Sequence, residues 1–556
     1  MMKDWFKTGR PWIWLTAGAV SVSLIAVLGL LALIAWRGLS FFWPAEIHEI
    51  QVQASDGSTK TVIGELYDTE EVPMERLAES GIVLENYSEE TLERWLLKVG
   101  NREYVPLDFM WIMEPQIVAD AKPLDVAKIE RSKNGNFYGY ITDVLEQGES
   151  VFNSSPEQSE LREELAQRIE RVLDINDQAE DLQNSEIGAI NYRLNQLRLE
   201  RRALALKEQL TDSEEQRIAA EEAQLRADYK VLEEELFAMR EEASRDSIVV
   251  RDMRGMDVTI PMYRVLDVTF PNDMGAIAKV GYFFSQIGNF VSENPREANT
   301  EGGVFPAIFG TVFMVLLMSV IVTPFGVVAA IYLHEYAGKN PVTRLIRIAV
   351  INLAGVPSIV YGVFGLGFFV YMVGGSLDQI FYPEALPSPT FGTPGVMWSA
   401  ITLAILTLPV VIVSTEEGLS RIPSSLREGS LALGATKAET LWRIIIPMAS
   451  PAIMTGLILA VARAAGEVAP LMLVGVVKSA PMLPVDGNFP YFHLDRKFMH
   501  LGFHIYDVGF QSPNVEAARP LVYATSFLLV TVIVGLNLTA ISVRNHLREK
   551  YRSLEH

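Results

Sequence analysis

Six long apolar segments constrain the fold of this chain more than any other feature. They are Trp12–Trp36, Phe305–Leu333, Ile346–Val373, Gly395–Thr415, Pro451–Val476 and Pro520–Ser542. An α-helix of roughly 20 apolar residues is long enough to cross the hydrocarbon core of a bilayer. The sequence therefore predicts an α-helical polytopic membrane protein with six transmembrane helices.

The first segment has the position of a secretion signal but not its form. Its apolar run is longer than the apolar core of a typical signal, and no cleavage site of small residues follows it before Phe41-Phe42-Trp43. We therefore expect it to remain in the protein as a membrane anchor.

The acidic residues of the chain are concentrated in one region. The whole chain of 556 residues has a formal net charge of −21. Residues 41–304 contain 53 acidic and 27 basic residues, whereas the remainder contains 15 acidic and 20 basic residues. This division indicates an acidic water-soluble block and a basic-flanked membrane block. The chain has no cysteine, which excludes disulfides, thiol chemistry and thiolate metal sites.

Lysine and arginine in the short loops predict the orientation in the membrane. They precede segment one, follow segment two, lie between segments four and five, and end the chain: Lys3, Lys7, Arg10, Lys339, Arg344, Arg347, Arg421, Arg427, Lys437, Arg443, Arg544, Arg548, Lys550 and Arg552. Lys478, Arg496, Lys497 and Arg519 depart from the pattern, in a longer loop. We expect both termini in the cytoplasm and the acidic block in the periplasm, as in a bacterial inner-membrane protein.

The acidic block combines strand and helix patterns. Residues 50–67, with a turn at Ser55-Asp56-Gly57, predict one β-hairpin, and residues 247–260 predict another. Glu157–Arg245 is almost free of Gly and Pro and contains heptad-spaced apolar residues, which predicts an antiparallel helical hairpin or coiled coil. A capping-box pattern at Thr211–Glu214 separates its helices. The hairpin either contacts a partner or is a solvated spacer; nothing in it resembles a catalytic site.

The loop at residues 416–450 predicts two short helices joined at a glycine. Capping boxes at Ser425–Glu428 and Thr436–Glu439 each begin a helix, and Gly434 ends the first in the left-handed conformation. Pro447 is expected to end the second helix. The second helix has an apolar face, formed by Leu441, Ile444 and Ile445 with Trp442 beside it. Such an elbow is suited either to docking a partner or to resting on lipid.

The spacing in this loop resembles the EAA loop of ABC importer permeases. The matching residues are Glu428, Gly434, Ile444, Ile446 and Pro447, with Glu428-Gly429-Ser430 where the family favours Glu-Ala-Ala. The resemblance implies the type I ABC importer permease fold and a coupling helix that is seated on a separate ATPase subunit. The chain contains no G-x-x-x-x-G-K-S/T phosphate loop, as expected of a permease that is not itself an enzyme.

Three further stretches resemble the phosphate transport system permease family, PstA. They are Glu301–Thr311, Gly355–Gly362 and Ala462–Leu471, within a resemblance that covers residues 300–545 and leaves the acidic block outside. It implies import of inorganic phosphate and a set of partners: a PstC-like permease, a PstB-like ATPase dimer that binds the ATP, a PstS-like phosphate-binding protein and a PhoU-like regulator. The resemblance also implies that lipid surrounds the chain. It implies no nucleic-acid partner and no cofactor bound by the chain itself.

Arg463 and Glu467 form a charge pair in segment five. A charge at the centre of a spanning helix costs about 2.5–3.5 kcal/mol, so it normally faces protein or a water-filled path. Arginine suits a tetrahedral oxyanion, and a nearby glutamate keeps binding weak enough for release. The resemblance likewise places both in the phosphate path, whereas a purely structural pair is the alternative. Ser358 and Tyr361, after Pro357, either line the path or pack around a proline kink.

The sequence thus predicts four parts. Residues 1–40 contain the N-terminus and first helix, 41–303 an α+β periplasmic insertion, 304–546 the permease core, and 547–556 a cytoplasmic tail. We expect a permease subunit for inorganic phosphate. The alternatives are a permease for molybdate or sulfate, and a membrane scaffold or signalling protein that acts through its periplasmic coiled coil. No metal site is predicted.

Overall fold

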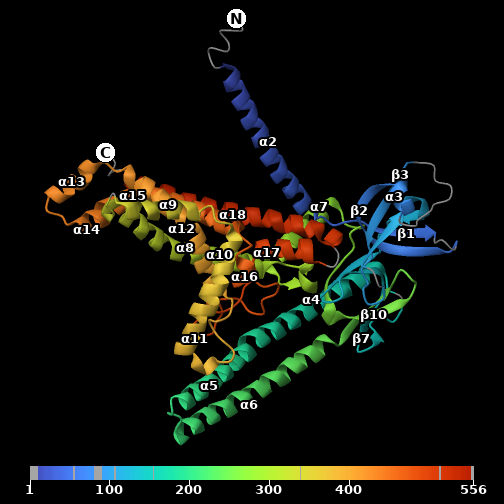
Figure 1. The fold of residues 1–556 in the computed structure, drawn as a ribbon. Helices are drawn as coiled ribbons and strands as arrows, with labels where there is room; N and C mark the ends of the chain where they lie inside the picture. Colours follow the sequence, from blue (N-terminus) through green and yellow to red (C-terminus); the bar gives the residue numbers. More distant parts are fainter. Residues whose placement is uncertain are drawn as a thin grey trace. The chain divides into compact units, whose positions relative to one another are not determined.

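The chain folds into two compact units, which are described separately. The computed structural model describes residues 10–53, 57–79, 90–105, 108–154, 156–338, 340–512 and 515–551. Unit 1 comprises Met1–Phe41, Phe290–Pro295 and Gly303–His556, and unit 2 comprises Phe42–Asn289 and Arg296–Gly302. Figure 1 traces both in sequence colours. Several predicted features lie outside the described residues: Lys3, Lys7, Lys339, Arg552, and Ser55 and Asp56 of the predicted turn.

Unit 1 is helical. Its helices are α2 (Arg10–Ser40), α8 (Phe305–Ile331), α9 (Pro341–Leu353), α10 (Ser358–Phe364), α11 (Gly375–Phe381), α12 (Val396–Ser420), α13 (Ser424–Ala432), α14 (Lys437–Thr440), α15 (Ile446–Gly466), α16 (Leu471–Val474), α17 (Leu501–Tyr506) and α18 (Val515–Tyr551). Turns of π-helix at Tyr332–Tyr336, Gly365–Gly374, Leu441–Ile445 and Asp507–Gln511 continue α8, α10, α14 and α17. Within the described residues, six stretches are long and apolar enough to cross a membrane, formed by α2, α8, α10 with α11, α12, α14 with α15, and α18. The predicted class and number of membrane helices are confirmed.

Two of the predicted membrane segments had wrong bounds. The third segment was expected from Ile346, but the chain breaks after α9 and the span begins at Ser358. Pro357 has no N–H to continue the helical hydrogen bonds, so a new helix starts after it. The fifth segment was expected at Pro451–Val476, but the span begins at Lys437 and ends with α15 at Gly466. Pro470 disfavours helix in the residue before it, and the chain is already extended at Glu467.

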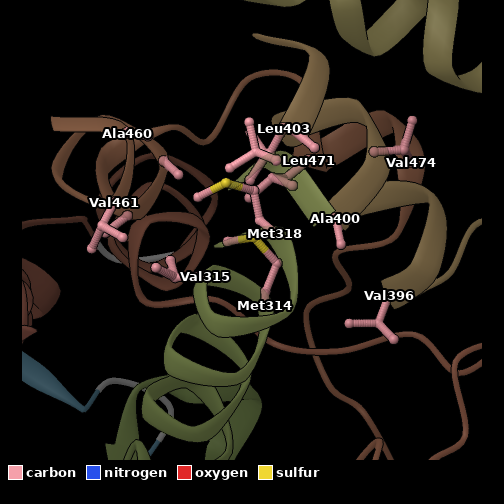
Figure 2. Close-up of a cluster of buried hydrophobic side chains, with 14 of the residues drawn as sticks. Met314, Val315, Met318, Val396, Ala400, Leu403, Ala460, Val461, Leu471 and Val474 are labelled. Carbon is pink, nitrogen blue, oxygen red and sulfur yellow. The ribbon is translucent and has the colours of Figure 1, made fainter. Parts of the chain in front are cut away.

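The core of unit 1 is formed by α8, α12 and α15. Met314 and Met318 of α8 lie among apolar side chains of α12 and α15, as Figure 2 shows. Glycines let these helices approach closely: a Cβ on Gly326 would lie 2.6 Å from a methyl of Val411. Small residues at helix crossings are the usual means of packing in membranes, where lipid and side chains are equally apolar.

Unit 2 contains two antiparallel sheets. The first has the order β4-β3-β2-β1-β5 and the second β10-β9-β7-β6-β11, with β8 beside β7. The strands are β1 (Ile47–Gln53), β2 (Thr59–Pro73), β3 (Thr91–Lys98), β4 (Phe109–Met113), β5 (Ile117–Ala121), β6 (Ala127–Arg131), β7 (Phe137–Glu146), β8 (Glu149–Ser150), β9 (Asp246–Arg251), β10 (Asp257–Pro261) and β11 (Val265–Thr269). The β1–β2 and β9–β10 pairs confirm both predicted hairpins. The short α3 (Met74–Glu79) follows β2, and two-residue strands β12 (Pro295–Arg296) and β13 (Glu301–Gly302) pair with each other.

A helical hairpin interrupts the second sheet between β8 and β9. It consists of α4 (Gln158–Leu182), a π-helical turn, α5 (Gly188–Leu206) and the returning α6 (Asp212–Ala243). Its base belongs to the core of the sheet, because Leu161 and Leu165 of α4 pack with strand residues. The Thr211 side chain accepts from the Glu214 N–H, as the capping pattern predicted. The predicted helical hairpin is therefore present, in an α+β unit.

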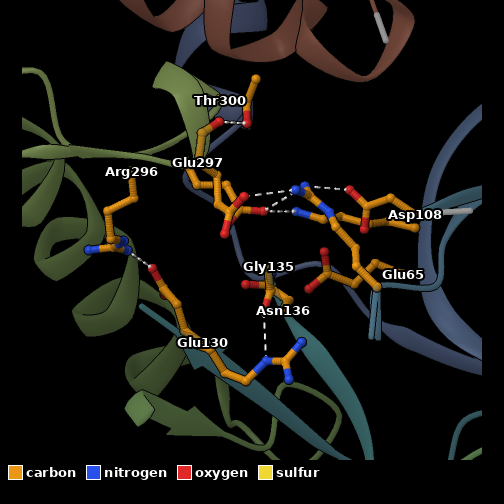
Figure 3. Close-up of polar contacts among 12 residues, drawn as sticks. Glu65, Asp108, Glu130, Gly135, Asn136, Arg296, Glu297 and Thr300 are labelled. Atoms are coloured by element: carbon orange, nitrogen blue, oxygen red, sulfur yellow. Dashed lines mark hydrogen bonds and ion pairs between the residues drawn. The ribbon is translucent and has the colours of Figure 1, made fainter. Parts of the chain in front are cut away.

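Charged side chains of unit 2 are joined in networks. Arg102 lies 2.8 Å from Asp108 and 3.1 Å from Glu297, and Arg296 pairs with Glu130 at 2.5 Å (Figure 3). In the second sheet, the fully buried Asp246 is contacted by three arginines, Arg168, Arg171 and Arg245. Such pairing offsets the cost of removing charge from water.

Candidate functional site: the elbow and the broken end of α15

The predicted elbow is formed by α13 and α14 with Gly434 between them. Gly434 has φ +88°, the left-handed conformation that ends a helix, and a Cβ there would meet nothing within 4 Å. Thr436 and Glu439 form the reciprocal capping box at the start of α14. Both features were predicted from sequence and are confirmed, and they fix the angle between the two short helices.

Two local predictions in the elbow were wrong. The Ser425–Glu428 capping box is not formed, because α13 begins at Ser424 and Pro423 precedes it without a side-chain cap. Pro447 does not end the second helix, which continues into α15. A π-helical turn at Leu441–Ile445 precedes the proline, and its wider backbone accommodates the missing N–H and the ring.

The elbow is held against the end of α8 by Glu335. The Arg427 guanidinium donates to the Glu335 carboxylate at 3.0 Å and to the carbonyls of Leu419 and Ile422. The Lys437 ammonium donates to the Glu335 carbonyl at 2.5 Å and lies over the Tyr336 ring. Sequence analysis did not identify Glu335, since its partners are about a hundred residues away and only folding brings them together.

The surface of the elbow has an exposed apolar part and a shallow hollow. Leu441 and Ile445 are buried in a core beneath it and Ile444 packs partly against that core, whereas Leu433 is 91% and Trp442 74% exposed. The hollow, of about 290 Å³, is lined by Ser430, Leu433, Gly434, Ala435, Glu439, Arg443 and Ile444. The Ser430 and Thr440 hydroxyls hydrogen-bond at 2.8 Å and join the two helices. Glu428 and Gly429 are exposed beside this hollow.

Arg463 and Glu467 lie where α15 ends. The distance from Arg463 Nε to the Glu467 carboxylate is 3.6 Å, and both side chains are partly exposed, at 32% and 21%. Arg463 was expected near the middle of its segment; it is three residues from the end of the helix, because α15 stops at Gly466. At this break the Glu467 N–H donates to the Ala464 carbonyl at 3.2 Å, so the charge pair lies at the last turn of the helix.

The three stretches that carry the family resemblance meet around this break. A Cβ on Gly362 would lie 2.7 Å from Pro470, so α10 packs directly on the chain that follows Glu467. A Cβ on Gly502 would lie 2.4 Å from Val468, and the N–H of the preceding residue, Leu501, donates to the Thr311 hydroxyl of α8 at 2.9 Å. Residues distant in sequence are thus assembled around residues 466–471.

Ser358 and Tyr361 are placed at the start of α10. The Tyr361 hydroxyl donates to the Leu353 carbonyl at 2.6 Å. This carbonyl belongs to the last residue of α9, and its helical partner four residues on would be Pro357, which has no N–H. Tyr361 therefore stabilises the break between α9 and α10. Ser358, the first residue of α10, is partly buried.

Two histidines near the break are buried and uncharged at neutral pH. Burial lowers the pKa of His500 and of His504 to about 4. His500 Nδ1 accepts from the Gly502 N–H at 3.1 Å and so caps α17. Among the described residues, no group of three or more His, Asp and Glu side chains could hold a metal ion.

Comparison with known proteins identifies the family. "Phosphate transport system permease protein PstA 1" of Mycobacterium tuberculosis (strain H37Rv) is 32% identical over 287 residues, covering 51% of this chain and 82% of that protein. The chain belongs to the PstA family. PstA of Yersinia pestis is 36% identical over 251 residues, covering 45% of this chain and 75% of that protein.

The PstA-family region coincides with the sites described above. The model of the family "Binding-protein-dependent transport system inner membrane component" matches residues 322–552. This range contains the elbow, Glu335 and the broken end of α15, and it leaves unit 2 outside. "Probable ABC transporter permease protein YqgI" of Bacillus subtilis is 30% identical, covering 45% of this chain and 81% of that protein. The chain is therefore a multi-pass membrane protein with the ABC importer permease fold.

Proposed function

We propose that the chain is a permease subunit of an ATP-driven importer that moves inorganic phosphate from the periplasm to the cytoplasm. The observation that carries the proposal is the identity to PstA permeases over most of their length, in a region that includes the elbow and Arg463. The chain contributes no ATP-binding loop of its own, so ATP is hydrolysed by a partner subunit.

The elbow is the proposed docking site for that ATPase. Its exposed Leu433 and Trp442 stand beside the hollow at Gly434, so a partner surface can bury apolar area there. Glu335 links the elbow to α8 through Arg427 and Lys437. Closure of the ATPase dimer would move the elbow, and α8 would move with it. This motion would open the site at the end of α15 alternately to the two sides of the membrane.

Arg463 is the proposed anion-binding residue. Its guanidinium carries a permanent charge and a planar set of donors that matches phosphate oxygens. Glu467, at 3.6 Å, competes for the same donors and keeps the anion from being trapped. Tyr361 would act beside them by holding the break at Pro357, and Ser358 offers a hydroxyl at the start of α10.

The basic residues of the short loops support cytoplasmic termini, a cytoplasmic elbow and a periplasmic unit 2. In this orientation the permease pairs with a PstC-like subunit, two PstB-like ATPase subunits dock from the cytoplasm, and a PstS-like binding protein delivers phosphate. A PhoU-like regulator would act on the cytoplasmic side.

Uptake of labelled phosphate by reconstituted vesicles tests the proposal. The chain, its co-expressed partner subunits and the binding protein should give uptake that requires ATP in the compartment of the elbow. Excess unlabelled phosphate should compete, and molybdate and sulfate should not. Preferential competition by molybdate or sulfate would establish a different oxyanion permease. Absence of ATP-dependent uptake in an assembled complex would favour a scaffold or signalling protein.

A further inference from the structure

Helix α7 (Ala276–Ser292) exposes a stripe of large apolar side chains, which is unusual for a helix on a water-soluble domain. Its exposed stripe is apolar: Ile277 is 91%, Val280 45%, Phe284 65% and Val291 37% exposed. These residues recur at intervals of three, four and seven, so they lie along one side of the helix. A helix that packs on a domain in water normally turns such a stripe inward.

The opposite side of α7 faces the protein and carries both apolar residues, such as Phe283 and Phe290, and the polar residues Lys279 and Tyr282. Lys279 is mostly buried, with its ammonium 3.9 Å from Glu46. Burial raises the pKa of the Tyr282 hydroxyl, which lies within reach of the charges of Lys128 and Glu130. Lys279 and Tyr282 therefore lie against charged groups of the protein, whereas the apolar stripe faces outward.

Phe290 in the last turn of α7 contacts residues next to two membrane helices, α2 and α8. The Phe290 ring lies edge-on to Phe41, the residue after α2 ends, with 6.5 Å between centroids. The Phe290 carbonyl accepts from the Val304 N–H at 2.8 Å, directly before α8 begins. Trp43 contacts Phe283 with 6.0 Å between centroids. The last turn of α7, at Phe290, therefore contacts the residues that directly follow α2 and directly precede α8.

We propose that α7 lies in the surface of the bilayer and inserts Ile277, Val280, Phe284 and Val291 into the boundary between lipid headgroups and acyl chains. An apolar stripe that faces outward is stable against an apolar environment. Next to two membrane helices, the lipid bilayer provides that environment. Phe41 and Trp43 directly follow α2 in the sequence, and aromatic side chains are favoured at the ends of membrane spans. The role of α7 is to anchor unit 2 to the lipid surface.

Site-directed spin labelling tests this proposal, because the chain has no native cysteine. Single cysteines at Ile277, Val280 and Phe284 would carry a nitroxide in the full chain, reconstituted in phosphatidylethanolamine and phosphatidylglycerol vesicles. The control label replaces Phe237 of α6, an aromatic residue that is 69% exposed on the hairpin. Accessibility to oxygen, which concentrates in acyl chains, is compared with accessibility to a water-soluble nickel complex.

The labels on α7 should be more accessible to oxygen than to nickel, whereas the label at position 237 should show the reverse. A label at Ser285, off the apolar stripe, should be shallower than the label at 284. Nickel accessibility at 277, 280 and 284 equal to that at 237 would overturn the proposal by placing α7 in water. Protection of these labels from both reagents would overturn it as well, because it would show a protein partner on the stripe.

Discussion

Units 1 and 2 use charge in different ways. Unit 2 buries charge as a structural element, as in the contact of Asp246 with Arg168, Arg171 and Arg245. Unit 1 has an apolar helical core, and its ion pairs include those of Glu335 in the elbow and Arg463 at the end of α15. A charge inside the membrane costs about 2.5–3.5 kcal/mol on insertion scales, which is the physical reason for proposing a function for Arg463.

The comparison predicts opposite effects of neutralising a charge. In unit 1, neutralising Arg463 or Glu335 should impair transport while the protein still inserts and assembles. In unit 2, removing a charge should lower stability while transport in the remaining folded protein persists. The account fails if both units respond in the same way.

The largest effect on transport is expected for Arg463→Gln. The substitution removes the charged donors for phosphate, and a hydrogen bond to a charged group contributes about 1.5–3 kcal/mol, so uptake should fall by roughly tenfold or more. Membrane insertion should be unchanged or better, since a charge is lost. Uptake in vesicles and the amount of assembled complex are measured, with Arg251→Gln, an exposed residue of unit 2, as the control. Uptake near the parental rate would make Arg463 structural.

The next largest effect is expected for Gly434→Val. A β-branched residue is strongly disfavoured at φ +88°, and left-handed backbone costs about 1–3 kcal/mol for non-glycine residues. The elbow should lose its angle, so uptake and substrate-stimulated ATP hydrolysis should both fall. Gly429→Ala is the matched control, because a Cβ there meets nothing within 4 Å and φ is not positive. Normal coupling in the assembled Gly434→Val complex would refute docking at the elbow.

A smaller effect is expected for Glu335→Gln. It weakens the tie between Arg427 and the end of α8 but leaves the backbone contact of Lys437 in place. ATP hydrolysis should continue, with fewer phosphate ions transported per ATP. The ratio of phosphate uptake to ATP hydrolysed is the measurement, and Glu417→Gln, an exposed carboxylate on α12, is the control. An unchanged ratio would show that Glu335 does not transmit motion.

In unit 2, Asp246→Asn should act on stability alone. The carboxylate is fully buried among three arginines, and breaking a buried ion pair typically costs about 3–5 kcal/mol. Proteolysis of unit 2 in the reconstituted protein should accelerate, whereas Asp257→Asn, at an exposed pair, should not change it. Uptake per intact complex should be close to parental. A loss of uptake without faster proteolysis would contradict the division between the units.

Local chemistry made much of unit 1 predictable. Apolar length predicted the number of spans, and glycine and capping chemistry predicted Gly434 and the Thr436–Glu439 box. Where proline was involved, the outcome depended on tertiary context. Pro357 and Pro470 accompany breaks, whereas Pro447 lies inside a continuous helix because a π-helical turn accommodates it.

Long-range contacts could not be predicted. Glu335 meets Arg427 across 92 residues, and Gly362 packs on Pro470 across a similar distance. The resemblance to a family indicated which stretches matter, but their convergence at the end of α15 required the fold. In unit 2 the hairpins and long helices were predicted from periodicity, whereas the contacts of Asp246 join positions up to 78 residues apart.

The division between the units is tested most directly by removing the outer part of the helical hairpin. Deletion of residues 177–240 keeps Leu161, Leu165 and Val172 in the core of the sheet. A linker of about four Gly and Ser residues can join the cut ends, since packed helices lie about 8–10 Å apart. The measurement is phosphate uptake in vesicles against the concentration of binding protein. The account predicts near-parental uptake at saturating binding protein, and complete loss of uptake in a complex that still assembles would contradict it.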